Sequence, residues 1–221
     1  MSLPAHHGHL SACGFVLAGG QSSRMGTDKA VVELNGITLI ARALATLRAA
    51  SLEPAIAGAR SDLGAYAPVV SDAESDLGPL SGVCAALSAT SAGLAVFLPV
   101  DLPLLPPSLI TYLLQHARIT DAAITLASVN GFPQTFPAVV ARRALPTLQA
   151  ELLGGRRGCY LAFKAAAAQL GEQVNVLPVE FLVQAGQVVD PLNLPATRWF
   201  HNLNTPRDLI AAATHHSNQA L

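Results

Sequence analysis

Short apolar runs alternate with helix-patterned runs over the first half of the chain, and this alternation restricts the possible folds more than any other feature. Four of the apolar runs have the length and composition of buried strands; they are Gly14 to Ala18, Pro54 to Gly58, Ala67 to Val70 and Leu94 to Leu98. Strands that alternate with helices are typical of a parallel sheet covered by helices on both faces. We therefore predict a three-layer α/β fold with a mostly parallel sheet.

Helix signals fall between and after the four predicted strands. The expected helices run from a cap at Thr38 to about Ala50, from Gly78 to about Thr90 and from Pro106 to about Ala117. An Asn35-Gly36 pair before the first of these helices predicts a tight turn. Nearly every element of this half thus has a local sequence signal of its own.

The second half of the chain has a less regular pattern. Phe181 to Arg198 has no clear period, and Pro191 and Pro195 within it predict a loop. A last helix of about two turns is expected to begin at Thr205-Pro206. The other expected elements are strands at Ala122–Ala127, Phe136–Val140 and Val174–Leu177, a turn at Asn130-Gly131, and helices at Arg142–Leu153 and Tyr160–Leu170. No internal repeat or linker divides the chain, so we predict a single domain over residues 1–221, with loose tails at 1–11 and 215–221.

The charge balance argues against several classes of partner. A net charge of −1 gives no electrostatic basis for binding nucleic acid or an anionic membrane. The uncharged stretch from Leu77 to Val100 has the length of a membrane span, but its glycines and prolines indicate a helix followed by a strand. Hydrophobic residues make up 51% of the chain, and we expect a monomer or a weak oligomer.

The cysteines indicate a reducing compartment. Cys13, Cys84 and Cys159 have no spacing that would suit a metal site or a redox pair, and unpaired thiols are typical of the cytoplasm. The N-terminal residues lack the basic start and apolar core of a signal peptide. We therefore expect a cytoplasmic protein.

Polar residues follow three of the predicted strands. A Gly-Gly pair at positions 19 and 20 follows the first strand, Asp72 follows the third and Asp101 follows the fourth. The carboxyl ends of parallel strands meet at one edge of a sheet, and α/β folds bind their ligands at that edge. We therefore expect these three positions to lie close together in one site.

The stretch after the first strand has the composition of a phosphate-binding loop. Gly19 and Gly20 let backbone N–H groups approach phosphate oxygens, while Arg24 offers a planar fork of donors and Lys29 a mobile charge. The spacing matches neither the Walker pattern nor Gly-x-Gly-x-x-Gly. Asp101, in a proline-flanked segment, is the kind of carboxylate that holds Mg²⁺ together with substrate phosphates.

Residues 17–29 read Leu-Ala-Gly-Gly-Gln-Ser-Ser-Arg-Met-Gly-Thr-Asp-Lys, and they closely resemble the signature loop of the molybdenum cofactor guanylyltransferases. These enzymes belong to a larger group of nucleotidyltransferases with a Rossmann-like fold. The resemblance implies catalytic roles for Arg24, Lys29 and Asp101, with Asp101 also holding Mg²⁺. The nucleotide-binding residues that it implies are Leu17, Ala18, Gly19, Gly20, Lys29 and Asp101.

Two further segments resemble the same family. Asp72, followed by Gly78-Pro79-Leu80-Ser81-Gly82, is similar to a family segment near the nucleoside, which implies that Asp72, Gly78 and Pro79 bind the nucleotide. Asn202-Leu203-Asn204-Thr205-Pro206 resembles a late family motif. It implies that Asn202 and Asn204 contact the substrate, or that Asn204 is a second, neutral oxygen ligand.

Two more substrate contacts are implied by the resemblance. Arg156, after Gly154-Gly155, is similar to an arginine in a family run that could meet an anionic pterin, although a solvated helix end is an equally good account of it. Gln134 lies in a stretch similar to one in the family. The chain departs from the family after the second strand, where Ala57 or Gly58 stands in place of a frequent asparagine, and in the length of the Phe181–Arg198 loop.

The reaction that the resemblance implies is transfer of GMP from GTP to the phosphate of molybdopterin or the molybdenum cofactor, with Mg²⁺ as cofactor and pyrophosphate as product. Transient contacts with cofactor-delivery proteins or molybdoenzyme chaperones are implied as well. The alternatives are a molybdenum cofactor cytidylyltransferase, another nucleotidyltransferase with a different acceptor, such as a sugar 1-phosphate, and a non-catalytic nucleotide-binding protein.

Overall fold

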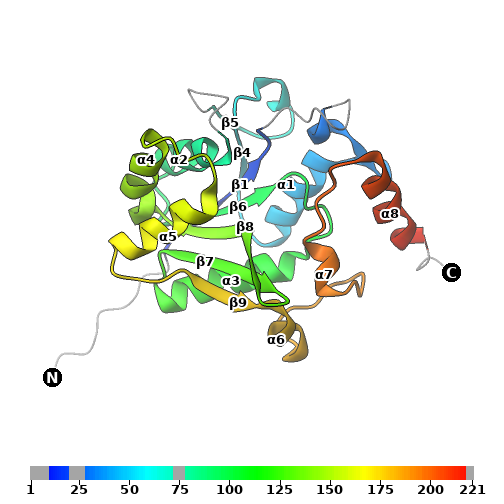
Figure 1. Cartoon of the computed structure of the whole chain (residues 1–221). Coiled ribbons are helices and arrows are strands. Elements are labelled where there is room, and N and C mark those ends of the chain that lie inside the picture. Colours follow the sequence, from blue (N-terminus) through cyan, green and yellow to red (C-terminus); the bar gives the residue numbers. More distant parts are fainter. Residues whose placement is uncertain (1–9, 20–27, 72–77, 218–221) are drawn as a thin grey trace.

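The computed structural model describes residues 10–19, 28–71 and 78–217 of the chain. Within these ranges, seven strands form one sheet in the order β5-β4-β1-β6-β8-β7-β9 (Figure 1). The strands are β1 (Ala12–Leu17), β4 (Pro54–Ala57), β5 (Val69–Val70), β6 (Leu94–Pro99), β7 (Ile124–Val129), β8 (Phe132–Ala141) and β9 (Asn175–Pro178). All neighbouring pairs are parallel except those made by β8, which is antiparallel to β6 and to β7. The predicted mostly parallel sheet is confirmed.

The reversal of β8 follows from the turn that precedes it. Asn130 and Gly131 have φ values of 50° and 78°, and a two-residue turn with positive φ at both positions joins antiparallel strands. The turn was expected from the sequence. The strand after it is longer than expected, because β8 begins at Phe132 rather than Phe136.

Helices cover both faces of the sheet, as predicted. The helices α1 (Leu39–Ala49) and α3 (Pro107–Thr120) pack on one face, and α2 (Pro79–Ala89), α4 (Leu145–Leu153) and α5 (Cys159–Gln169) pack on the other (Figure 1). Side chains alternate between the two faces along a strand. In β1, Val16 accordingly packs with α1 and α3, whereas Phe15 and Leu17 pack with α2.

A small hairpin precedes α1. A short 3₁₀ helix, η1 (Lys29–Val31), leads into β2 (Glu33–Leu34) and β3 (Ile37–Thr38), which pair across the predicted Asn35-Gly36 turn. Thr38 caps α1, because its Oγ1 accepts a hydrogen bond from the Ala41 N–H at 3.4 Å. Two further 3₁₀ helices, η2 (Ser61–Leu63) and η3 (Arg142–Ala144), follow β4 and β8.

The segment that was predicted to be a loop, Phe181 to Arg198, contains two short helices, so that prediction was wrong in part. These helices are α6 (Val179–Gln184) and α7 (Ala196–Trp199). The buried carboxylate of Asp190 accepts hydrogen bonds from the Leu194 N–H at 2.8 Å and from Nε1 of Trp199 at 3.2 Å. A local period cannot reveal such an arrangement, since tertiary contacts hold it together.

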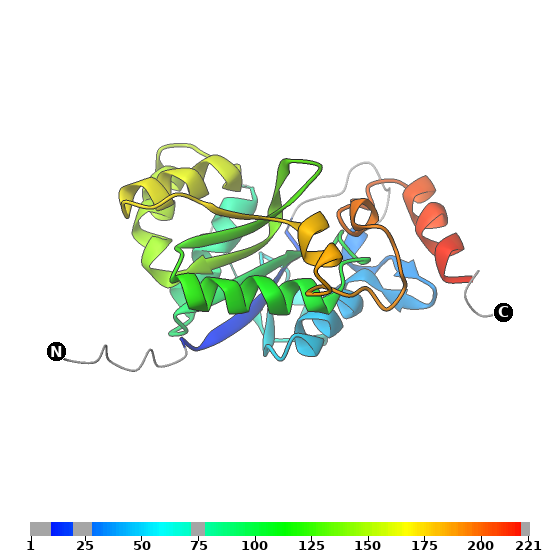
Figure 2. The ribbon, with the colours of Figure 1, turned by 90° about the horizontal axis from the view of Figure 1, so that it is seen from below.

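The last helix, α8 (Pro206–Ser217), begins where the sequence indicates but runs further, into the predicted tail. It lies beside the β2–β3 hairpin, although the two segments are far apart in the sequence (Figure 2). The Asp208 carboxylate accepts hydrogen bonds from the backbone N–H groups of Asn204 at 2.9 Å and Thr205 at 2.8 Å. These bonds hold the pKa of Asp208 below its usual value, and the bond from the Asn204 N–H has the largest effect.

The uncharged stretch from Leu77 to Val100 forms α2 and β6 over its described part, as expected. Of the helices in the described ranges, none combines the length and apolar character that crossing a bilayer requires.

Candidate active site

The parallel register of the central strands brings remote residues to one edge of the sheet. Leu17, the last residue of β1, lies opposite Ala57 in β4 and Pro99 in β6. The residues that follow these three strands, among them Gly19 and Asp101, therefore lie at the same carboxyl edge, as the sequence predicts. A backbone hydrogen bond joins the ends of β1 and β6, since the Val100 N–H donates to the Leu17 carbonyl at 3.1 Å.

Lys29, Asp101 and Asn204 meet at this edge. The Lys29 Nζ lies 3.0 Å from Oδ2 of Asp101 and 2.6 Å from Oδ1 of Asn204. The Lys29 and Asp101 side chains are only 15% and 22% exposed, so water screens their ion pair less than it would screen a surface pair. Three segments far apart in the sequence thus build one cluster, which we call the lysine cluster.

Each member of the lysine cluster is positioned by its local backbone. Asp28 caps η1 by accepting a hydrogen bond from the Ala30 N–H at 3.1 Å, and Lys29 is the first residue of that helix. The Leu203 N–H donates to the Asp101 carbonyl at 3.1 Å, which ties the segment carrying Asn204 to the end of β6. Asp208 then fixes the backbone of Asn204 itself.

Two glycines face each other where β1 and β4 end. Gly58 has a φ of 137°, and a Cβ added to it would lie 3.2 Å from the Gly19 nitrogen. Backbone conformation and close packing therefore both require glycine at position 58. A Cβ added to Gly19 would have no described atom within 4 Å, so the described fold does not require glycine at position 19.

Gly78 and Pro79 open α2 at the same edge. Gly78 has a φ of 78°, and an added Cβ would lie 3.2 Å from the Arg157 carbonyl oxygen. The Leu80 N–H points to that carbonyl at 3.4 Å. Gly78 is thus accounted for by close packing against the segment that carries the two neighbouring arginines.

The family model for the MobA-like NTP transferase domain matches residues 14–171. This chain belongs to that family. It is therefore a nucleotidyltransferase, and the predicted membership and enzyme class are confirmed. Members of this family typically work with a divalent metal ion.

Relatives and solved structures agree with this membership. The chain is 33% identical over 203 residues to the molybdenum cofactor guanylyltransferase of Vibrio atlanticus, covering 90% of this chain and 94% of the relative. It is 32% identical to the protein of that name from Photobacterium profundum, covering 88% and 91%. The crystal structure of the molybdopterin-guanine dinucleotide biosynthesis protein A from Archaeoglobus fulgidus has the same fold, with a TM-score of 0.73, 24% identity and coverage of 93% and 98%.

Three residues predicted for the site of this MobA-like enzyme are not bonded to the lysine cluster in the part of the chain that the structure describes. The Arg156 guanidinium pairs with Glu151, and the Gln134 amide donates to the Phe132 carbonyl at 3.0 Å. Asn202 is exposed. Within the described residues, no hydrogen bond joins any of these three side chains to the lysine cluster. Their roles remain predictions.

Gly20, Arg24 and Asp72 lie outside the described residues.

One polar residue at the carboxyl edge, Arg60, was not predicted. Arg60, just after the Gly58 turn, hydrogen-bonds to the side chain of Asp28 and to the Ala18 carbonyl. A single arginine after a strand gives no sequence signal, because such a side chain is usually solvated. The bonds of Arg60 to Asp28 and Ala18 become visible only in the folded structure.

The oxygens of the lysine cluster suit a hard divalent cation. Asp101 supplies a carboxylate and Asn204 an amide oxygen, and both already face one cationic atom, the Lys29 Nζ. No group of three or more His, Cys, Asp or Glu side chains in the described ranges could form an all-protein cage. Mg²⁺ commonly binds one or two carboxylates together with substrate phosphates, so these donors fit it without such a cage.

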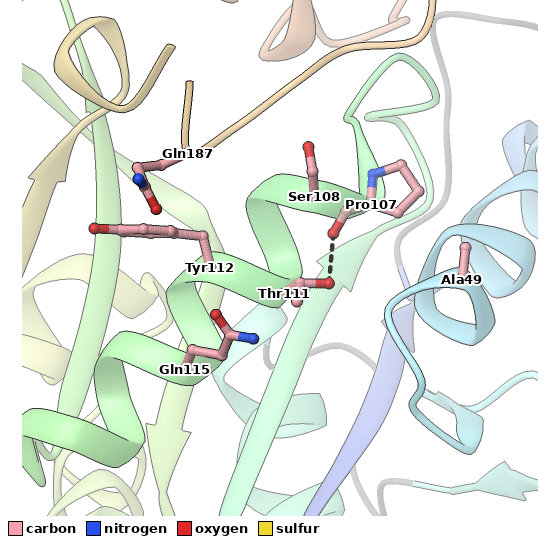
Figure 3. Close-up of a pocket in the computed structure, with 7 residues that line it drawn as sticks. All are labelled: Ala49, Pro107, Ser108, Thr111, Tyr112, Gln115 and Gln187. Carbon is pink, nitrogen blue, oxygen red and sulfur yellow. Dashed lines mark hydrogen bonds between the residues drawn. The ribbon is translucent and has the colours of Figure 1, made fainter. Parts of the chain in front are cut away.

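A hollow of about 390 Å³ beside α3 is a different feature (Figure 3). Its lining is Ala49, Pro107, Ser108, Thr111, Tyr112, Gln115 and Gln187. No lining side chain is charged, so the hollow offers no cation to balance the charge of a polyphosphate.

The described cysteines at positions 84 and 159 are not suited to attack a substrate. Burial raises the pKa of Cys84 to about 11 and of Cys159 to about 12, so neither thiol is a ready nucleophile.

Proposed function

We propose that this enzyme transfers GMP from GTP to the phosphate of molybdopterin. A phosphate oxygen of molybdopterin forms a new bond to the α-phosphorus, the bond between the α- and β-phosphates breaks, and pyrophosphate leaves. The observation that carries the proposal is the meeting of Lys29, Asp101 and Asn204 at the carboxyl edge of the sheet. Relatives that match almost the whole chain carry the name molybdenum cofactor guanylyltransferase.

The residues at the end of β1 would bind the triphosphate. Gly19 leaves open space among the described atoms, which a phosphate oxygen could use to approach the backbone N–H groups. Lys29 would turn its ammonium group from Asp101 and Asn204 toward the phosphates, because a lysine is a mobile point charge on a flexible stem. Gly20, Arg24 and Asp72 are assigned to the same nucleotide on the resemblance alone.

Asp101 would hold Mg²⁺, with Asn204 as a neutral oxygen donor beside it. When bound, Mg²⁺ would withdraw charge from the α-phosphate and orient it for attack. Lys29 would stabilise the negative charge that develops on pyrophosphate. No covalent intermediate with the protein is required, so the protein contributes positioning and charge stabilisation.

The acceptor would lie on the side of the site where α2 begins. The Arg157 side chain is exposed, and its backbone packs against Gly78. It can offer an anionic pterin a free guanidinium fork, whereas Arg156 is already paired with Glu151. We also assign three residues to binding of the acceptor on the resemblance to the family: Arg156, Gln134 and Asn202.

We assign the enzyme to the cytoplasm because its three cysteines are free thiols. It would receive molybdopterin from delivery proteins and pass its product to molybdoenzymes or their chaperones. A monomer or weak oligomer fits this role.

Pyrophosphate release tests the proposal. Purified protein is supplied with Mg²⁺, molybdopterin and one nucleotide at a time from GTP, CTP, ATP and UTP. Release with GTP alone, reduced on the order of 100-fold or more in Asp101→Ala, is the expected result. Preference for CTP would identify a cytidylyltransferase. This is the leading alternative, because neither Ala57 nor Gly58 offers the side-chain amide that is frequent in the guanylyltransferases. Nucleotide binding without release would indicate another acceptor or a non-catalytic binding protein.

A further inference from the structure

The Arg60 guanidinium uses every N–H donor that it has. Its Nε and one terminal nitrogen bond to the two oxygens of Asp62 at 2.9 and 2.8 Å. Its two terminal nitrogens also bond to the two oxygens of Asp28, one of them at 3.1 Å. The fifth bond runs to the Ala18 carbonyl at 3.3 Å. A guanidinium has five N–H groups, so none is left for another acceptor.

The partners of Arg60 lie at both sides of the nucleotide-binding segment. Ala18 directly follows β1, and Asp28 directly precedes Lys29. The backbone of Arg60 is fixed as well. Its backbone N–H donates to the Gly58 carbonyl at 2.8 Å, and Gly58 packs on Gly19. One side chain thus links the ends of β1 and β4 to the start of η1.

The two carboxylates that Arg60 contacts differ in their exposure to water. The Arg60 side chain is 17% exposed and that of Asp28 is 39% exposed, whereas Asp62 is 60% exposed. The bonds to Asp28 and Ala18 are therefore better shielded from water than those to Asp62.

We propose that Arg60 is a positioning residue for nucleotide transfer. It holds Asp28, and Asp28 caps the helix that begins with Lys29. It also holds the carbonyl of Ala18, next to Gly19. Arg60 thus fixes the backbone on both sides of the phosphate-binding segment before the nucleotide arrives, and it does not bind phosphate itself. This inference rests on the proposed function, since it names a residue that prepares the same site.

Lysine cannot replace arginine in this arrangement. Two carboxylates and one carbonyl accept hydrogen bonds from the same side chain, which requires the rigid five-donor fork of a guanidinium. An ammonium group has three donors on a flexible stem and can satisfy one carboxylate well. Arg60→Lys is therefore expected to behave much like Arg60→Ala, although it keeps the charge.

A direct phosphate contact by Arg60 makes the opposite prediction for its partner. If Arg60 left Asp28 to bind phosphate, Asp28→Asn would release it and strengthen nucleotide binding. If Arg60 is a positioning residue, Asp28→Asn weakens binding, although the asparagine oxygen can still cap Ala30. The sign of this change separates the two roles.

The experiment compares Arg60→Ala, Arg60→Lys, Asp28→Asn and Asp62→Ala with the matched control Arg143→Ala. Arg143 also lies between two carboxylates, Asp121 and Glu172, but at the other edge of the sheet. Amide hydrogen exchange of Ala30 to Val32 is measured without ligand. Equilibrium binding of GTP with Mg²⁺ and the steady-state kinetics of transfer to molybdopterin are measured in parallel.

Both Arg60 variants are expected to exchange the Ala30–Val32 amides faster than the wild type. We expect kcat/KM for the nucleotide to fall on the order of 100-fold, because small misplacements of binding groups have effects of that size. KM for molybdopterin should stay unchanged, as should all readouts for Arg143→Ala apart from thermal stability. Asp62→Ala should have an intermediate effect.

Wild-type exchange in the Arg60 variants would overturn the inference even if GTP transfer were established. Stronger GTP binding by Asp28→Asn would also overturn it and assign Arg60 to phosphate. Should the wild type transfer no nucleotide, the proposed function fails, and exchange together with binding of each nucleotide still tests Arg60.

Discussion

The two edges of the sheet both carry charged clusters, but these clusters bond to different kinds of group. At the amino edge, Glu172 accepts a hydrogen bond from the Ala123 N–H at 2.8 Å, and Arg142 donates to the Thr90 carbonyl at 2.8 Å. At the carboxyl edge, the Lys29 ammonium bonds to the side chains of Asp101 and Asn204. The amino-edge cluster uses its charges to satisfy backbone groups in addition to the Arg143–Glu172 ion pair. The side-chain bonds of the lysine cluster join only its own three members.

This difference separates groups that maintain the fold from groups that are available to a ligand. A buried backbone group that loses its partner is costly, so the amino-edge side chains cannot leave their positions cheaply. The lysine cluster can rearrange without orphaning any backbone group, because the adjacent Asp101 carbonyl has its own partner in Leu203. Self-contained clusters of this kind are therefore better guides to activity than charge alone.

The largest expected effect comes from the lysine cluster. Lys29→Ala and Asp101→Ala should each reduce the rate of pyrophosphate release by on the order of 100- to 1,000-fold, the usual loss when a preorganised charge is removed. Thermal unfolding should change little. Thermal destabilisation large enough to account for the lost rate would contradict the division between the two edges.

Asn204→Ala should have a smaller effect on the same reaction. It removes a neutral oxygen donor beside the metal-binding carboxylate, so we expect a rate loss on the order of 10-fold. Steady-state kinetics at several Mg²⁺ concentrations provide the measurement, and the metal concentration needed for half-maximal rate should rise. An unchanged metal requirement would show that Asn204 does not bind the metal and only contacts Lys29.

The facing glycines test the same division at the carboxyl edge itself. Gly58→Ala should lower the free energy of unfolding by about 1–3 kcal/mol, because its φ of 137° strains any residue with a Cβ. Gly19→Ala should leave unfolding unchanged and weaken nucleotide binding. Urea unfolding and equilibrium binding of both variants decide the matter. Equal stability losses would show that Gly19 is a fold requirement too.

The smallest expected effect lies at the amino edge. Glu172→Gln keeps an acceptor for the Ala123 N–H but loses the ion pair with Arg143, so it should lower the free energy of unfolding by about 0.5 kcal/mol. Glu172→Ala also removes the acceptor and should cost about 1–3 kcal/mol. Neither should alter kcat. A change in kcat for Glu172→Gln would mean that the two edges are coupled.

The sequence was sufficient for the first half of the fold because most of its elements have a local signal. Thr38 caps α1 and Asn35-Gly36 turns the hairpin as expected, and the strand ends place Asp101 at the predicted edge. It was insufficient for α6 and α7. These two helices depend on the hydrogen bond between the buried side chains of Asp190 and Trp199, and the segment that contains both residues has no periodic pattern.

The site could be predicted as a set of residues, but its pairings could not. Lys29, Asp101 and Asn204 were all expected, yet no spacing indicates that one ammonium group joins positions 175 residues apart. Arg60 had no signal at all, because its five bonds depend on where β1, β4 and η1 meet. Local chemistry is visible in a sequence, whereas partnership depends on the folded topology.

The contact between Lys29 and Asn204 also bears on when the protein becomes active during its synthesis. A chain emerging from the ribosome presents Lys29 and Asp101 well before Asn204 has been translated, and domains begin to fold from the N-terminal side. The growing chain can form β1, β4 and β6 while the ammonium group has one of its two oxygen partners. We therefore expect a nascent chain to lack the assembled cluster until its C-terminal segment is released.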